Sequence, residues 1–247
     1  MIYIKKGPPH RNVSTKAAEI RRNPNWKKIP ETRPTDPKQQ EGYGSTLRSY
    51  FDQLPKKEIR ETLLEEQHGL CAYCMRRISN PDDVKIEHWF PLSEARDTAI
   101  DYQNFLGSCD GIYSENQQPC SCCDKKKSGT IIKIDPQKQW MMDYIKYESD
   151  GTLYFDAPDG LDPEIKEAID RDINETLCLN GEESELTLHR EKVLQSCKKT
   201  LKQLYLKNKC SVHNVERLIA ELEQMQQYPE YIGVMLFFYK RWLKNHT

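Results

Sequence analysis

Hydrophobic positions in the second half of the chain recur with the period of an α-helix. Apolar residues four positions apart predict a helix that starts at Asp162-Pro163 and ends near Asn180-Gly181: Ile165, Ile169, Ile173 and Leu177. Similar periodicity predicts three more helices, over about residues 182–208, 212–226 and 229–244. The pattern therefore predicts a large helical region at the C-terminal end.

The middle of the chain mixes helical and strand-like patterns. Helical spacing of Leu47, Tyr50, Phe51 and Leu54 predicts one helix, and Pro55 starts a second helix that ends near Gly69. Alternation predicts a strand over residues 84–88, and residues 144–148 and 152–155 flank a turn typical of a hairpin. We also expect a helical turn from Asp101 to Leu106, a helix over residues 123–127, and a β-like segment over residues 130–136.

These patterns predict an α+β protein with three regions. Residues 1–45 contain many prolines and polar residues, so we expect an extended basic arm with at most a short helical turn at residues 17–22. Residues 46–156 form the predicted catalytic domain, and residues 157–247 form the helical region.

Charge is distributed unevenly along the 247 residues. The net charge is only −1, but the first fifty residues hold eleven Lys and Arg against four Asp and Glu. A basic segment of this kind favours phosphate contact, although a solvated tail or a segment bound to a partner protein explains it equally well. No apolar run reaches the length of a bilayer span, so we expect no membrane association.

Nine cysteines raise the question of disulfides or metal. Their odd number, the lack of a signal peptide and the cluster at positions 109–123 argue against a secreted disulfide protein. We expect a cytoplasmic protein whose thiolates bind metal.

Cys71 and Cys74 have the Cys-x-x-Cys spacing that supplies two thiolates to a structural zinc ion. The second pair must come from four cysteines further on: Cys109, Cys120, Cys122 and Cys123. Spacing alone allows Cys120 with Cys123 or Cys109 with Cys123. The alternative is a set of ordinary buried thiols, which is also how we interpret the helical cysteines Cys178, Cys197 and Cys210.

Residues between and after these cysteines suit phosphodiester hydrolysis. Glu87 and Asp124 are oxygen ligands for a divalent ion such as Mg²⁺ or Mn²⁺, and His88 suits a general base. Lys127 lies one helical turn after Asp124 and can face the same phosphate. Each residue alone is more often a surface ion pair or a helix cap, but their combination within a cysteine-bounded segment favours catalysis.

The segment resembles the HNH endonuclease family, whose core is a ββα-metal fold. The resemblance rests on these elements: Cys71 and Cys74, Glu87-His88 with Pro91, Asn104-Phe105, Cys109, Cys123-Asp124, and Lys127. It implies that His88 is the base, that Glu87 and Asp124 bind the catalytic metal, and that Asn104 positions the histidine loop. It also favours Cys109 over Cys120 as the zinc ligand. The long loop from Cys109 to Cys123 and the Asp at position 124 depart from the usual pattern.

Softer features extend the resemblance over most of the chain. The basic start, the Cys-Ala-Tyr-Cys and Ile-Glu-His-Trp-Phe-Pro motifs and the helical tail are similar to PtuB-type HNH nucleases of bacterial Septu and retron anti-phage systems. This similarity implies a nuclease acting on DNA, RNA or tRNA with a PtuA-like ATPase, and in retrons with a reverse transcriptase and its RNA/DNA product. It also implies that the helical region and the basic arm dock partners.

Three other functions compete with this prediction. A zinc-stabilised module that binds nucleic acid or a partner without cleavage would have no need of the Glu-His, Asp and Lys set. A stand-alone restriction-type HNH nuclease would favour a DNA-reading module, which the C-terminal pattern lacks. A redox protein is the weakest alternative, because the Cys-x-x-Cys has further cysteines that suit zinc.

Overall fold

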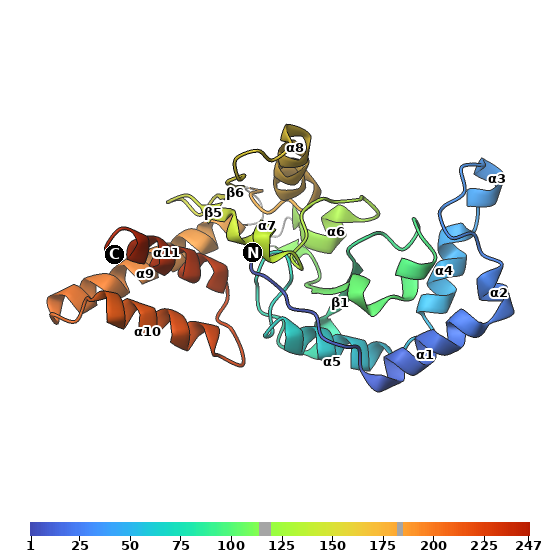
Figure 1. Ribbon diagram of the computed structural model, residues 1–247, viewed down its shortest axis with the longest axis horizontal. Helices are drawn as coiled ribbons and strands as arrows, with labels where there is room; N and C mark the ends of the chain where they lie inside the picture. Colours follow the sequence, from blue (N-terminus) through green and yellow to red (C-terminus); the bar gives the residue numbers. More distant parts are fainter. Residues whose placement is uncertain (114–119, 182–184) are drawn as a thin grey trace.

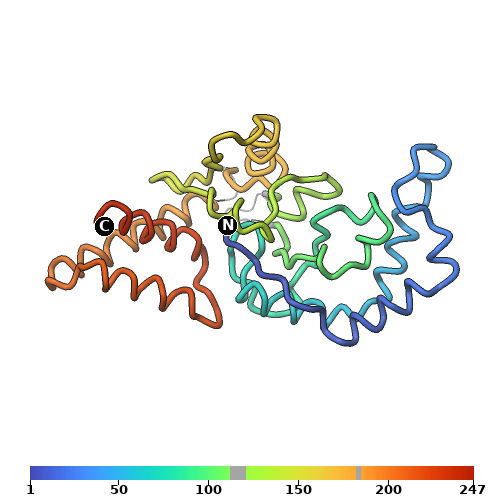
Figure 2. The backbone as a smooth tube through the Cα atoms, viewed as in Figure 1, coloured from blue at the N-terminus to red at the C-terminus, as the bar shows by residue number. Residues whose placement is uncertain are grey.

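The computed structural model describes residues 1–113, 120–181 and 185–247 and contains many helices and three small antiparallel sheets. The molecule is elongated, with the first helices at one end, the last helices at the other, and the strands and α6 between them (Figures 1 and 2). This mixture of helices and antiparallel strands confirms the predicted α+β class.

The N-terminal region is helical, so the expected extended arm is wrong. Its elements are α1 (Arg11–Arg22), α2 (Pro24–Lys27) and α3 (Pro37–Gln40). Prolines lie at the first positions of α2 and α3, where the missing N–H costs nothing, so they start helices here rather than break them. Val13, Ala17 and Ile20 form a buried stripe on α1. They join one hydrophobic core with residues of α4, α5 and β2.

Two helices and a strand pair support the middle of the molecule. Helices α4 (Tyr43–Phe51) and α5 (Lys56–Glu66) confirm the helical spacing on either side of Pro55. Strand β1 (Lys85–His88), after the short η1 (Pro81–Asp83), pairs antiparallel with β2 (Phe105–Ser108), and His88 lies opposite Phe105. The expected turn from Asp101 is limited to η3 (Tyr102–Asn104), which follows η2 (Asp97–Ile100), and the chain then becomes strand.

Helix α5 is attached to the strand pair by the buried side chain of Gln67. Its amide oxygen accepts from the Gly107 N–H at 2.7 Å, and its amide nitrogen donates to the Gly107 carbonyl at 2.8 Å. These bonds satisfy buried backbone groups at the outer edge of β2. The short strands β3 (Ile112–Tyr113) and β4 (Cys120–Ser121) then lead to α6 (Cys123–Lys127).

The expected hairpin is present as β5 (Ile145–Tyr147) and β6 (Leu153–Phe155), after α7 (Gln139–Asp143). Residues 130–136, by contrast, form no strand. The Asp172 carboxylate accepts from the N–H groups of Lys133, at 2.5 Å, and Ile134, at 3.0 Å. A side chain therefore satisfies the amides that a partner strand would otherwise bind.

The C-terminal part is helical as predicted. Helix α8 (Pro163–Arg171) continues as one π-helical turn, η4 (Asp172–Thr176), and three helices follow: α9 (Leu186–Leu206), α10 (Val212–Glu223) and α11 (Ile232–Lys244). Helix α11 packs on both α9 and α10. The predicted helix end at residues 180–181 is a few residues too late, because the regular helix stops at η4. No helix in the described part of the chain combines the length and the apolar content that a bilayer span requires.

Candidate metal centre and catalytic pocket

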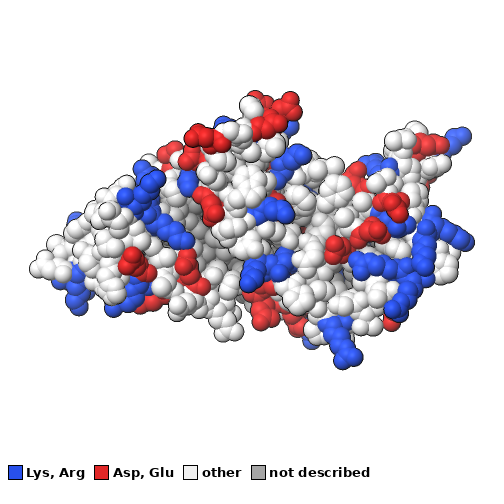
Figure 3. Space-filling view, in the orientation of Figure 1, with Lys and Arg blue, Asp and Glu red and all other residues white. Residues whose placement is uncertain are grey.

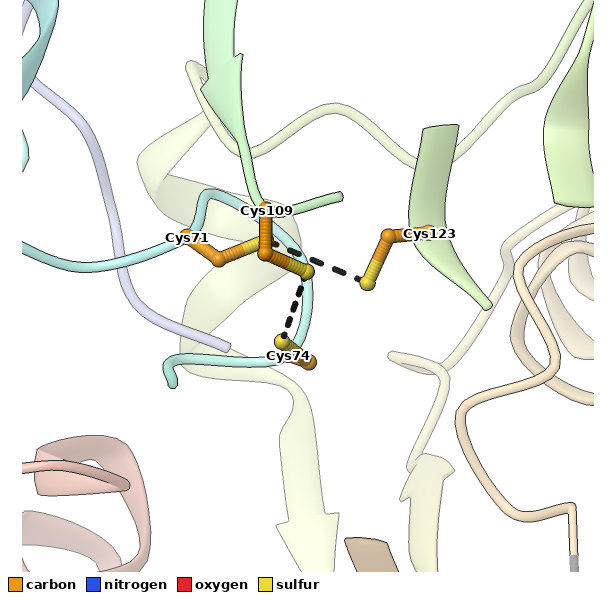
Figure 4. A group of neighbouring side chains, drawn as sticks. All are labelled: Cys71, Cys74, Cys109 and Cys123. Atoms are coloured by element: carbon orange, nitrogen blue, oxygen red, sulfur yellow. Dashed lines mark hydrogen bonds between the residues drawn. The ribbon is translucent and has the colours of Figure 1, made fainter. Parts of the chain in front are cut away.

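Four cysteines from three parts of the chain meet in the core. The sulfurs of Cys71, Cys74, Cys109 and Cys123 all lie within 4.8 Å of one another, and all four side chains are buried (Figure 4). Cys71 and Cys123 are 3.9 Å apart, and Cys74 and Cys109 are 3.8 Å apart. These distances are far longer than a disulfide bond, and all of these thiols are free.

Local structure brings each sulfur to this point. Cys71 and Cys74 lie in a tight turn, closed by the Met75 N–H to the Cys71 carbonyl at 3.1 Å. Cys109 follows directly after β2. Cys123 is the first residue of α6 and adopts a left-handed backbone with φ of 55°. The cluster thus connects the end of α5, the strand pair and α6.

The cluster fits a tetrahedral zinc ion. Four sulfurs at about 2.3 Å from one zinc ion lie about 3.8 Å apart, close to the observed separations. Hydrogen bonds from Cys122 and Cys123 hold the pKa of Cys109 far below its ordinary value, which favours the thiolate form that a metal ion binds. The Arg76 guanidinium donates to the Cys109 sulfur at 3.4 Å. These residues can therefore hold a metal ion such as zinc.

Cys109 occupies the fourth position that the sequence left open between two cysteines. The side chain of Cys120, the alternative, lies outside the described part of the structure. Cys122 is buried beside the cluster, 3.9 Å from the Arg76 guanidinium, and nothing in the sequence distinguished it.

Glu87 and Asp124 meet beside this cluster as a carboxylate pair. Glu87 is only 4 % exposed, and Tyr73 donates a hydrogen bond to its carboxylate at 3.2 Å. Burial and a hydrogen bond shared with Asp124 raise the pKa of Glu87 to about 9. The raised pKa favours the protonated form of Glu87 beside Asp124, and a cation between the two carboxylates would favour the ionised form of Glu87 instead.

Lys127 does not face the pocket as we expected. Its side chain is 0 % exposed, and its ammonium lies 2.5 Å from the Glu87 carboxylate. It also donates to the His88 carbonyl at 2.9 Å. The helical spacing correctly placed Lys127 on the same side as Asp124, but burial turns it toward the protein, where it balances the charge of the carboxylate pair.

His88 lies next to this pair, and its side chain is almost fully buried. Its Nε2 is 3.1 Å from the Ala99 carbonyl, and because a carbonyl only accepts, Nε2 carries the proton and Nδ1 the lone pair. The ring packs edge-on against Phe51 and Phe105, with centroids 4.6 and 4.9 Å away. Burial lowers the pKa of His88 to about 3, so the imidazole is neutral at neutral pH.

Asn104 holds the loop that follows His88. Its amide oxygen accepts from the Phe90 N–H, and its amide nitrogen donates to the Phe90 carbonyl, both at 2.8 Å. The same nitrogen donates to the Thr98 carbonyl at 3.0 Å. Because Ala99, the next residue, binds the imidazole, Asn104 fixes the segment that orients His88.

The carboxylate pair and His88 open onto one pocket of about 850 Å³. Glu87, His88 and Asp124 line it together, although neighbouring strand residues normally point to opposite faces. Helices α4 and α5 form the opposite side. Five cationic side chains line the pocket, more than its acidic ones: Arg48, Lys56, Arg60, Lys85 and Lys125. Sequence reasoning missed the cations of α4 and α5, although Lys56 and Arg60 have the spacing that places them on one helical face.

The chain matches no protein-family model, and no curated protein matches it.

Proposed function

We propose that this protein is a metal-dependent HNH-type endonuclease that hydrolyses phosphodiester bonds in nucleic acid. One observation carries the proposal: Glu87, His88 and Asp124 line a single cation-rich pocket beside a four-cysteine cluster. Carboxylates suit a divalent ion, a neutral imidazole suits a base, and surrounding cations attract a phosphate. These groups are the ones that phosphodiester hydrolysis requires.

The order of elements around the pocket supports this proposal. Two antiparallel strands, β1 and β2, are followed along the chain by helix α6, as a ββα-metal core requires. His88 ends β1, Asn104 precedes β2, and Asp124 lies in the first turn of α6. The cysteine cluster holds the ends of these elements together, which gives it a structural role beside the pocket.

In the proposed reaction His88 removes a proton from the attacking water. Its Nε2–H is held by Ala99, so Nδ1 is the atom that accepts this proton. Asn104 keeps the loop in place and therefore acts as a positioning residue. Lys127 balances the negative charge of Glu87 from the protein interior. It also donates to the His88 carbonyl and is therefore a second positioning residue.

Glu87 and Asp124 are the residues that would hold Mg²⁺ or Mn²⁺. Burial and the neighbouring Asp124 carboxylate raise the pKa of Glu87, and a divalent ion held between the two carboxylates would offset this cost. When bound, the ion would neutralise charge on the phosphoryl group and on the leaving oxygen.

We extend the proposal to the biological setting through the sequence resemblance. The similarity to PtuB-type nucleases implies a bacterial anti-phage effector that works with a PtuA-like ATPase, in some systems beside a retron reverse transcriptase. The C-terminal helices, which lie at the opposite end of the molecule from the α1–α4 end, are a surface on which such a partner could dock (Figure 1). Cleavage would then depend on the partner's state.

A second function is favoured by the burial of His88, which is only 5 % exposed. A module that binds nucleic acid through the cationic pocket without cutting it would have no need of an accessible base. This alternative predicts binding that does not depend on Mg²⁺ and no cleavage under any condition.

Cleavage of labelled DNA and RNA distinguishes these functions. Zinc-loaded wild-type protein is assayed with Mg²⁺ or Mn²⁺, alone and after co-expression with its ATPase partner. We expect cleavage by wild type and by the control His213→Ala, whose histidine is exposed on α10, and a loss of at least ~100-fold in His88→Ala. Equal cleavage by His88→Ala, or none by wild type in any condition, contradicts the proposal.

A further inference from the structure

Three cations on α4 and α5 form one side of the pocket. Arg48 lies on α4, and Lys56 and Arg60 lie one turn apart on α5; we call these three residues the cationic wall. Phe51 separates the wall from His88. The Lys56 ammonium lies 2.8 Å from the centroid of the Phe51 ring, and the same ring packs edge-on against the His88 ring, with centroids 4.6 Å apart.

The charge of the wall is poorly balanced within the protein. Lys56 has one acidic neighbour, Asp52, at 3.8 Å. Arg48 and Arg60 make no ion pair with any residue that the structure describes. The Nε of Arg60 is buried and has no hydrogen-bond acceptor in the same part of the chain. A buried donor without an acceptor is costly, so the protein does not fully satisfy the Arg60 guanidinium.

The charges of Arg48 and Arg60 both act on the ammonium of Lys56. Burial lowers the pKa of Lys56 to about 7; Asp52 opposes this shift, and the charges of Arg48 and Arg60 add to it. Such like-charge repulsion destabilises the free protein and is relieved when an anion binds among the cations.

Resting on the proposed function, we propose that the cationic wall binds the phosphate next to the scissile phosphate of the same strand. The scissile phosphate must lie by His88 and the carboxylate pair, whereas Lys56 of the wall lies over the Phe51 ring, which packs against the imidazole. The substrate is therefore a polynucleotide chain with at least two consecutive phosphates. Recognition through phosphates reads the backbone of DNA or RNA and depends little on base sequence.

Binding tests the wall without any cleavage. Zinc-loaded protein, with no other divalent ion added, is titrated into fluorescent 20-nucleotide DNA and RNA over a range of salt concentrations. For Arg48→Gln/Arg60→Gln we expect a Kd at least ~100-fold higher and a salt slope smaller by ~1.4 for single strands. The control Arg21→Gln/Arg22→Gln removes the same charge from exposed positions on α1, which contributes no residue to the pocket lining. Lys and Arg also gather over the α1–α2 end of the molecule (Figure 3). We expect this control to change Kd less than ~3-fold.

One further variant makes the outcome specific. Arg48→Lys/Arg60→Lys keeps the charge, so we expect it to retain the wild-type salt slope while losing part of the affinity. Wild-type Kd and slope in Arg48→Gln/Arg60→Gln, or an equal loss in the control double variant, overturns the proposal. Circular dichroism and zinc content establish that each variant is folded.

A small substrate separates this proposal from the proposed function. Bis(4-nitrophenyl) phosphate has no neighbouring phosphate, so we expect the double glutamine variant to lose at least ~30-fold more activity on polynucleotide than on this ester. Equal losses on both substrates overturn the role of the wall. If wild type hydrolyses neither substrate, the nuclease proposal fails, while the binding titration still decides whether the wall holds phosphates.

Discussion

Replacing Lys127 with Met tests the buried charge balance beneath the pocket. Lys127 is fully buried and makes two charged contacts, to the Glu87 carboxylate at 2.5 Å and to the His88 carbonyl at 2.9 Å. Met keeps the aliphatic volume but leaves the carboxylate pair without its cation. Removal of one partner of a buried ion pair costs about 3–5 kcal/mol, which in a chain of this size lowers Tm by about 6–20 °C.

Urea unfolding of zinc-saturated protein measures this loss. Lys126→Met is the matched control, because Lys126 is exposed on the same helix and its substitution should change stability by less than ~0.5 kcal/mol. Adding Glu87→Gln to Lys127→Met removes the uncompensated charge, so the double-mutant cycle should give a coupling of about 2 kcal/mol. A Lys127→Met protein as stable as Lys126→Met, or additive effects in the cycle, would refute the charge balance described above.

Three other predictions concern the cysteine cluster, His88 and Asn104. Cys109→Ser should lower zinc content, measured by mass spectrometry, to below half an ion per chain, whereas Cys210→Ser should keep the wild-type content. Because burial holds the pKa of His88 near 3 and the unfolded imidazole titrates near 6.5, the unfolded state binds more protons between these values. Stability from this residue is therefore complete above about pH 6.5 and lost as pH falls; from pH 7 to 5, wild type should lose ~2 kcal/mol more than His88→Asn in urea unfolding. Asn104→Ala should lower kcat by at least ~10-fold with a smaller change in KM, and unchanged kcat would contradict its positioning role.

Local patterns predicted much of the fold because the elements concerned are amphipathic. Helices α4, α5, α9, α10 and α11 present regular apolar stripes, and apolar and polar residues alternate in the sequence of residues 84–87. The prolines of the first region led us to expect an extended arm. Proline breaks a helix in its interior, but it can also start one at its first turn. Strand β2 and the loop at residues 130–136 depend on distant partners, Gln67 and Asp172, which no local pattern contains.

The site was predictable in its composition and less so in its arrangement. Cys-x-x-Cys spacing and the later cysteines indicated a thiol cluster, because metal ligands repeat at characteristic separations. The burial of Lys127 and His88 could not be predicted, since it depends on how α6 and the aromatic rings of α4 and β2 pack. The cationic wall comes from two helices that precede the predicted motif, so only the folded chain brings it to the pocket.

Cleavage can depend on a partner, so metal binding tests the central claim most directly. Mn²⁺ is titrated into zinc-loaded protein at neutral pH, and free Mn²⁺ is followed by electron paramagnetic resonance. If Glu87 and Asp124 form the second metal site beside His88, wild type binds one Mn²⁺ per chain and Glu87→Gln/Asp124→Asn binds none at the same concentrations, with zinc content unchanged. A wild-type protein that takes up no Mn²⁺, or a double variant that binds it equally well, contradicts the account.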